Sequence, residues 1–184
     1  MSNYRKLLNS ELGRVSSEEF PKIEKIPVTI VLDNVRSQHN IGAAFRSADA
    51  FAAEKIFLCG ICATPPSAEI HKSALGAENS IPWEYFEETT DAVKKLKTEG
   101  YTIVSVEQTE NSTMLDNFSL NGQERYALIF GNEVKGVNQE VVNNSDMVLE
   151  IPQYGTKHSI NVSVSIGVVL WEFSKLAKYN KDAF

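Results

Sequence analysis

Residues 149–173 constrain the fold most, because they read as a short strand, a glycine-bearing loop and a long helix in direct succession. The apolar run before Pro152 predicts the strand, which ends there since proline cannot donate to a sheet ladder. Ser159 and Asn161 suit a helix start, because their side-chain oxygens can accept from N–H groups that the first turn leaves unpaired. The sequence therefore predicts a helix from this point to about Tyr179.

This predicted helix carries one apolar face and one line of small side chains. Its apolar residues recur at three- and four-residue steps, the spacing of a buried face: Val162, Ile166, Val169, Leu170, Phe173 and Leu176. Ser159, Ser163 and Gly167 follow one another at four-residue steps, and small side chains let another backbone come close. We expect the apolar face to enter the core and the small-residue line to meet another segment or a second subunit.

Apolar strands alternate with helical segments along the rest of the chain. Strands are expected at residues 28–35, 55–59, 83–86, 101–106, 126–130 and 148–151. Helices are expected at residues 43–51, 68–78, 90–97 and 139–143, with one or two polar helices in residues 1–25 and an irregular segment at 114–120. The alternation predicts an α/β fold, a mostly parallel sheet with helices on both faces.

Length and composition favour one domain at residues 26–184, preceded by a helical extension at residues 1–25. A chain of 184 residues with 42% hydrophobic and 23% charged residues is typical of a globular domain. The first residues lack the apolar core of a signal peptide, and no apolar run is long enough to span a membrane. We expect a cytoplasmic protein without a membrane partner.

The net charge of −6 argues mildly against a nucleic-acid partner, but its distribution matters more than its sum. Arg36, Arg46, Lys135 and Lys157 fall in or beside three polar loops, whereas acidic residues collect in peripheral segments. A locally basic binding site is therefore compatible with the net negative charge of the chain.

Cys59 and Cys62 form a C-x-x-C pair, the spacing of a thioredoxin-like redox site. Cys59, however, continues an apolar strand, where a cysteine behaves as a small hydrophobic residue, and no second pair completes a metal site. We therefore expect neither redox function nor a bound metal.

Three of the predicted strands end in unusual loops, at residues 33–42, 131–136 and 152–161. In parallel α/β sheets, ligands bind beyond the carboxyl ends of the strands, where these loops would meet. The first strand is not followed by G-x-G-x-x-G, which disfavours an ordinary dinucleotide site, and the order Gly155-Thr156-Lys157 does not match a phosphate-binding G-K-[ST].

The three loops carry one motif each. They read N-x-G-x-x-x-R, G-N-E-x-x-G and I-P-x-x-G-x-x-x-S-I-N-V-S, and comprise Asn40, Gly42 and Arg46, then Gly131, Asn132, Glu133 and Gly136, then residues 151–163. This ordered set resembles the SPOUT class, specifically the SpoU/TrmH-type RNA 2′-O-ribose methyltransferases, over roughly residues 27–178. Ile160 and Gln153 stand where that family more often has leucine and methionine.

The resemblance implies a sheet whose C-terminal segment threads a loop to form a deep trefoil knot. It also implies S-adenosyl-L-methionine bound by the knot loops, a homodimer that completes each active site, and an RNA substrate. We expect tRNA in preference to rRNA, because no RNA-binding domain precedes the motifs. By position, the cofactor contacts would be Val106, Glu107, Gly131, Ile151, Ser159 and Ile160.

The resemblance also assigns a catalytic set. Arg46 matches the family's proposed base, although a guanidinium stays protonated, so it could instead grip the RNA phosphate beside the target ribose. Asn40 and Asn161 would orient Arg46 and the loops, and Ser159 would steady the cofactor loop. Glu133 would cap backbone donors, pair with an arginine or hold a turn.

Other interpretations of these residues remain open at the level of sequence. Without the family, Arg46 could lie on a solvated face or in a buried ion pair, and His39 and His158 could accept protons or merely face solvent. The competing functions are a non-catalytic RNA- or cofactor-binding module on the same fold and a small-molecule α/β enzyme.

Overall fold

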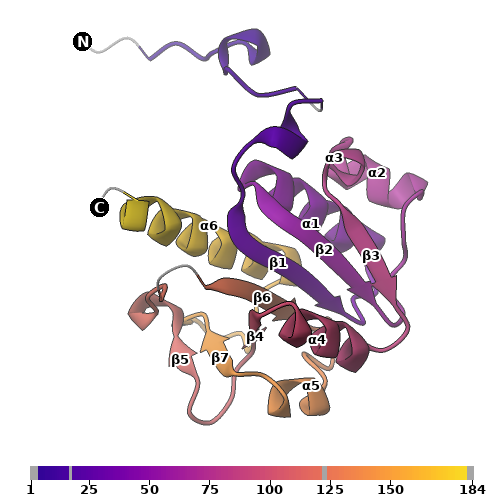
Figure 1. The fold of residues 1–184 in the computed structure, drawn as a ribbon, viewed down its shortest axis with the longest axis vertical. Coiled ribbons are helices and arrows are strands. Elements are labelled where there is room, and N and C mark those ends of the chain that lie inside the picture. The colour runs from indigo at the N-terminus through magenta and orange to yellow at the C-terminus, as the bar shows by residue number, and fades with distance from the viewer. Residues whose placement is uncertain (1–3, 17, 122–123, 182–184) are drawn as a thin grey trace.

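A parallel sheet forms the centre of the protein. The computed structural model describes the backbone of residues 4–16, 18–121 and 124–181 and places the strands in the order β3-β2-β1-β6-β4-β7-β5 (Figure 1). The strands are β1 Ile26–Asp33, β2 Ala53–Cys59, β3 Trp83–Phe86, β4 Tyr101–Val106, β5 Thr113–Met114, β6 Arg125–Phe130 and β7 Met147–Glu150. Every pairing between these strands is parallel, which confirms the predicted sheet.

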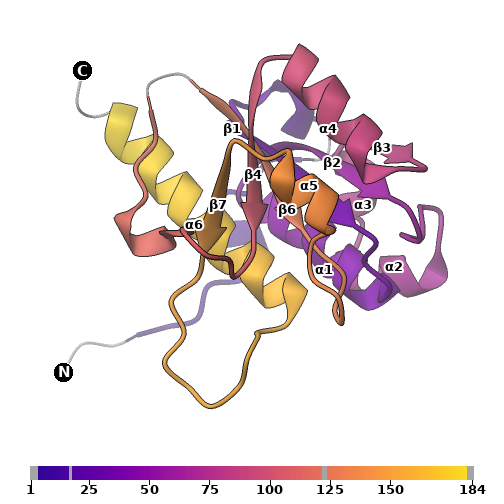
Figure 2. The same cartoon turned by 90° about the horizontal axis from the view of Figure 1, so that it is seen from below.

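Helices cover both faces of the sheet (Figure 2). They are α1 Gln38–Ala50, α2 Ala68–Ala74, α3 Ala77–Ser80, α4 Thr89–Thr98, α5 Gln139–Asn143 and α6 Val162–Lys181. Strand β1 shows how the layers form, since Ile30 and Leu32 join the core with α1 and α6 while Val31 joins the core with α4 and α5. Successive strand residues point to opposite faces, so an unbroken apolar strand supplies two cores.

Helix α6 begins as the sequence predicts. Asn161 is the residue before its first turn, and its side-chain Oδ1 accepts from the backbone N–H of Ser163 at 2.8 Å. Ser159 lies outside the helix, so the line of small residues does not continue along one helical face. A Cβ added at Gly167 would meet nothing within 4 Å, so no other segment among the described residues packs closely against that glycine.

The structure corrects two expectations near the N-terminus. The described parts of residues 1–25 hold two 3₁₀ turns, η1 Asn9–Glu11 and η2 Phe20–Lys22, where polar helices were expected. Helix α1 starts at Gln38, before the expected position 43, because the Ser37 side chain caps it and accepts from the backbone N–H of Asn40. Asn40 is thereby placed inside the first turn, with its side chain free to link other segments.

The segment expected to be irregular, residues 114–120, is also partly ordered. It contributes the end of β5, which pairs with β7, and the 3₁₀ turn η3 Leu115–Asn117.

Gly42 serves the packing of two helices. A Cβ at this position would lie 2.1 Å from Ser73 Oγ and 2.3 Å from the backbone oxygen of Ile70, both on α2. Helix α1 therefore lies against α2 at a distance that only glycine permits.

The cysteines are buried thiols. Burial raises the pKa of Cys59 far above its ordinary value and raises that of Cys62 to about 11, so both stay protonated near neutral pH. This supports a structural role.

No helix among the described residues has the length and apolar character needed to cross a membrane. The trefoil knot implied by the family resemblance stays a prediction.

Candidate functional site

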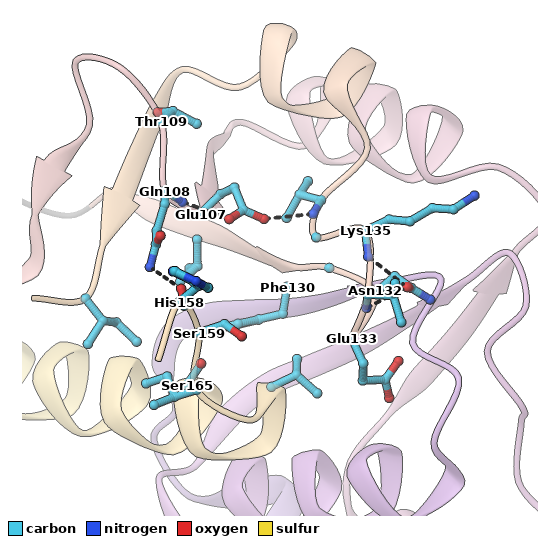
Figure 3. Close-up of a pocket in the computed structure, with 18 of the residues that line it drawn as sticks. Glu107, Gln108, Thr109, Phe130, Asn132, Glu133, Lys135, His158, Ser159 and Ser165 are labelled. Carbon is cyan, nitrogen blue, oxygen red and sulfur yellow. Dashed lines mark hydrogen bonds between the residues drawn. The ribbon is translucent and has the colours of Figure 1, made fainter. Parts of the chain in front are cut away.

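A cavity of about 730 Å³ lies beyond the carboxyl ends of β4, β6 and β7 (Figure 3). Its walls are the loops that follow these strands together with the first turns of α6. All the positions that the sequence predicted as cofactor contacts line it: Val106, Glu107, Gly131, Ile151, Ser159 and Ile160. Three adjacent parallel strands bring these loops together, because their carboxyl ends meet at the same edge of the sheet.

Glu133, in the loop after β6, caps the start of α1. Its carboxylate accepts from the backbone N–H groups of Arg36 at 3.0 Å and Ser37 at 2.9 Å, and from Asn40 Nδ2 at 3.0 Å. Burial alone would raise the pKa of Glu133, but these donors outweigh it and lower the pKa below its ordinary value of 4.5. Of the alternatives open at the sequence level, the structure selects the backbone cap, and Glu133 forms no ion pair with an arginine among the described residues.

Asn40 connects all three motifs. Its Nδ2 donates to Glu133, while its Oδ1 accepts from Asn161 Nδ2 at 3.2 Å. Asn161 at the same time caps α6, and Asn40 is almost fully buried. The two asparagines therefore link the three loops to one another, but neither has a hydrogen bond to Arg46 among the described residues.

The loop at residues 131–138 is fixed by backbone packing. A Cβ at Gly131 would lie 2.0 Å from the backbone carbon of Gly136 and 2.1 Å from the backbone nitrogen of Val137. Gly136 has φ +69, and its own Cβ would lie 2.2 Å from Glu107 Oε2. Glycine is required at both positions because the loop folds back on itself where it lines the cavity.

Glu107 holds this loop against β4. Its Oε2 accepts from the backbone N–H of Val137 at 3.0 Å, and its Oε1 accepts from that of Gln108 at 2.8 Å. Glu107 was predicted as a cofactor contact. In the structure its carboxylate also holds Val137 and Gln108 in place, and both residues line the cavity.

Several residues that fix the site carried no predicted role. Buried Asp33, at the end of β1, accepts from Thr89 Oγ1 at 2.6 Å and from the backbone N–H of Asn138 at 2.7 Å. Asn132 Nδ2 donates to the backbone oxygen of Asn34 at 2.7 Å. The signal was present for Asp33, because a carboxylate that ends a run of buried strand residues needs partners.

A single side chain fastens the long loop between β7 and α6 to β4. Gln108 Nε2 donates to the backbone oxygen of His158 at 3.0 Å, a bond visible in Figure 3. Among the described residues, the segment 152–160 has no other hydrogen bond. Among the described residues, the conformation of this loop is therefore fixed only by its two ends and by the hydrogen bond from Gln108.

Arg46 lies outside the cavity. It is exposed on α1 and forms no hydrogen bond or ion pair within the described part of the chain, which excludes the buried ion pair considered from the sequence. Glu133, Ser159 and Asn161 line the cavity, and Asn40 lies behind them, hydrogen-bonded to Glu133 and Asn161. Arg46 does not line it.

The lining of the cavity suits a ligand with both apolar and polar parts. Val106, Phe130, Ile151 and Val162 supply apolar surface, and Ser159 among other residues supplies hydrogen-bonding groups. The volume falls in the range of small-molecule sites, and tightly folded backbone beside glycine provides close backbone contact. Across the described residues, no three His, Cys, Asp or Glu side chains cluster as metal ligands would.

Two of the three motifs line the cavity, and Asn40 of the first motif is hydrogen-bonded to both of them. A parallel α/β sheet with this site is the fold of the SPOUT class. The chain belongs to the SpoU rRNA Methylase family, whose sequence pattern matches residues 27–171.

Two curated relatives show the range of RNAs in the family. The chain is 31% identical over 146 residues to a 23S rRNA (guanosine-2′-O-)-methyltransferase of Neisseria meningitidis, covering 79% of this chain and 57% of the relative. It is 32% identical over 151 residues to a tRNA (guanosine(18)-2′-O)-methyltransferase of Aquifex aeolicus, covering 78% of this chain and 66% of the relative. The chain thus spans less than two thirds of the length of these relatives.

Solved structures support the same fold. A TrmH/SpoU tRNA modifying enzyme of A. aeolicus matches 90% of this chain and 82% of its own with a TM-score of 0.79 at 23% identity. An AdoMet-bound rRNA methyltransferase of Sinorhizobium meliloti matches 85% of this chain and 59% of its own with a TM-score of 0.76 at 26% identity.

Proposed function

We propose that this protein transfers a methyl group from S-adenosyl-L-methionine to a ribose 2′-hydroxyl in a structured RNA. One observation carries the proposal: Glu133, Asn40 and Asn161 join the three motifs in one hydrogen-bonded unit beside a cavity lined by every expected cofactor contact. Family membership and the activities named for the relatives support it.

The cavity is the proposed site of S-adenosyl-L-methionine, which supplies an electrophilic methyl group when bound. The backbone of the loop at Gly131 and the residues Ile151, Ser159 and Ile160 hold it, with the threaded loop of the proposed trefoil knot as one wall. Much of this surface is backbone, so affinity depends on the shape of the loops more than on single side chains. A bound AdoMet in a related structure supports the assignment.

Arg46 is the proposed group that acts on the RNA. Its guanidinium is exposed and unpaired within the described residues, so both edges of its planar fork are free to bind phosphate oxygens. A bidentate grip on the phosphate beside the target ribose would fix the 2′-hydroxyl. As the hydroxyl oxygen bonds to the methyl carbon and the carbon–sulfur bond of the sulfonium breaks, that phosphate or a neighbouring group would take the hydroxyl proton. Positioning and proton removal are what this reaction requires of the protein.

The distance of Arg46 from its own cavity favours a homodimer in which each chain supplies Arg46 to its partner's site. Helix α6 offers a surface for this, because Val164, Val168 and Trp171 are 52%, 39% and 61% exposed at i, i+4 and i+7. These residues form a second apolar face beside the buried one, and Trp171 contacts Phe51 at the end of α1 with ring centroids 6.3 Å apart. An apolar stripe of this kind is suited to a partner.

The substrate is a tRNA or an rRNA, and the preference for tRNA stays a prediction. Residues 26–184 form the proposed methyltransferase domain, residues 1–25 an extension to it, and the cytoplasm its proposed location. The test is nucleoside mass spectrometry of tRNA and rRNA from a deletion strain and its parent, paired with methylation in vitro. A single 2′-O-methylnucleoside must disappear in the deletion strain and be restored by the purified protein. A methyl group found on a base, or no transfer to any RNA, would refute the proposal.

A further inference from the structure

The basic residues of the domain divide into two groups by their partners. Arg125 and most lysines of residues 26–177 form ion pairs with carboxylates: Lys55, Lys72, Lys94, Lys95, Lys97 and Lys175. Within the described residues of that range, Arg36, Arg46, Lys135 and Lys157 have no such pair. Arg36, Lys135 and Lys157 lie on the loops that follow β1, β6 and β7, and Arg46 lies within α1.

One exposed aromatic side chain, Tyr154, lies in the same loop as the unpaired Lys157. Tyr154 is 94% exposed, and it lies in the loop between Gln153 and His158, both of which line the cavity. Lys157 follows three residues later in the same loop, which Figure 2 shows projecting from the domain between β7 and α6. Neither the ring nor the hydroxyl of Tyr154 has a partner within the described part of the chain.

We propose that Tyr154 is a stacking platform for an unpaired nucleobase of the RNA next to the reacting ribose, with Lys157 on the adjoining phosphate. The inference rests on the proposed function and adds a contact residue to it. A fully exposed ring beside an unpaired cation offers a base its π-face and the backbone a counter-charge, which is how proteins hold single-stranded nucleic acid. A base inside a duplex is already stacked on its neighbours, so this site selects RNA whose target nucleotide lies in a loop.

The loop is built so that it can receive such a ligand. Among the described residues its single hydrogen bond, from Gln108 to the backbone of His158, fixes one end of the loop. A Cβ at Gly155 would meet nothing within 4 Å, so the backbone next to Tyr154 is not packed against another described segment.

The test compares Tyr154→Ala and Tyr154→Phe with the control Trp83→Ala. Trp83 is another exposed aromatic residue, but it is the first residue of the edge strand β3 and so lies away from the carboxyl ends of the strands, where the cavity is. The probe is a fluorescent RNA hairpin whose loop contains the nucleotide that the protein methylates. Its binding affinity is measured with the loop unpaired and with the loop paired to a complementary strand. Loss of one base–aromatic stack, about 1–3 kcal/mol, should weaken binding of Tyr154→Ala by roughly 5- to 150-fold. Tyr154→Phe and Trp83→Ala should bind as the parent protein does, and pairing the loop should remove the difference.

Three further readouts separate the possible results. Cofactor affinity and the mass in light scattering should be unchanged in Tyr154→Ala, and a change in either would overturn the inference by making Tyr154 a cofactor lid or a subunit contact. If Tyr154→Ala binds the RNA as tightly as the parent protein does, and the parent protein is active, the stacking role of Tyr154 is overturned and the proposed function stands. A parent protein that methylates no RNA would instead refute the proposed function.

Discussion

Asn161 donates a hydrogen bond from its side-chain amide to the side-chain oxygen of Asn40 at 3.2 Å, across 121 positions of sequence. The same Asn40 amide group donates to Glu133, so one residue connects the start of α1, the loop after β6 and the cap of α6. The position of α1, and with it Arg46, is therefore tied to the loops that form the cavity wall.

Arg46→Ala should leave folding and cofactor affinity unchanged, because the side chain is exposed and unpaired within the described residues. Methyl transfer should fall by about 10²- to 10⁴-fold, and Arg46→Lys should recover little of it, since lysine lacks the planar fork. Calorimetry with S-adenosyl-L-methionine and single-turnover methylation would measure both effects. Full activity of Arg46→Ala would refute a catalytic role.

The same variant tests which subunit supplies the arginine. Chains carrying Arg46→Ala should be co-expressed with chains carrying Gly131→Ala, and the mixed dimer should be isolated by two affinity tags. If Arg46 acts on its partner's cavity, the mixed dimer has one complete site and about half the parent activity, although each variant alone is inactive. An inactive mixed dimer would place Arg46 in the site of its own chain.

Gly131→Ala should weaken cofactor binding, because a Cβ there would lie 2.0–2.3 Å from backbone atoms of Gly136 and Val137. The loop must move to accept it, so cofactor affinity should drop by tenfold or more, equivalent to at least about 1.4 kcal/mol. Gly155→Ala is the matched control, since its Cβ would meet nothing within 4 Å. Equal affinity of the two variants would show that the loop tolerates the clash.

Glu133→Gln should destabilise the protein in a pH-dependent way. The pKa of Glu133 is lowered in the folded state, so its stabilisation is present above the ordinary value of 4.5 and is lost as the pH falls through the folded value. At neutral pH the substitution should cost about 1 kcal/mol, a figure reduced for solvent screening. Urea unfolding should show the two proteins converging below pH 4.5, and a constant difference down to the acid transition would contradict the prediction.

Val168→Asp should convert the proposed dimer into a monomer, because it places a charge in the exposed apolar stripe of α6. Light scattering should then give a particle of 20.5 kDa. Gly167→Leu provides a second probe, since a Cβ there is unobstructed within the chain and any loss of assembly must come from a partner. A parent protein that is itself monomeric at micromolar concentration would rule out the dimer.

Asp33→Asn should destabilise the loop after β6. Asp33 accepts from Thr89, Asn34 and the backbone of Asn138, and an asparagine must turn its NH₂ group toward at least one of these donors. The expected cost is about 1–3 kcal/mol of unfolding free energy, together with weaker cofactor binding. Thermal unfolding and calorimetry would measure the two effects, and an unchanged melting temperature would contradict this account of the buried carboxylate.

The parallel sheet could be predicted because its strands are continuous apolar runs that end at proline, glycine or polar residues. The motif positions came from family resemblance. Those predicted as cofactor contacts line the cavity, whereas Asn40, Gly42 and Arg46 do not. The hydrogen bond between Asn40 and Asn161 and the contact of Gly42 with α2 could not be predicted, because both depend on tertiary distances that no local pattern encodes. The helices expected in residues 1–25 were wrong, because leucines at helical spacing remain exposed there and have no core to bury them.

The neutralised lysines have a kinetic consequence. Most lysines described between residues 26 and 177 are matched by carboxylates, and the whole chain carries a net charge of −6, so we expect much of the surface to repel a polyanion. Arg36, Arg46, Lys135 and Lys157 have no carboxylate partner among the described residues of that range, so their charge can attract phosphates within a Debye length of about 8 Å at physiological ionic strength. If the protein acts on RNA as proposed, encounters that bring the RNA to these residues should last longer than other encounters.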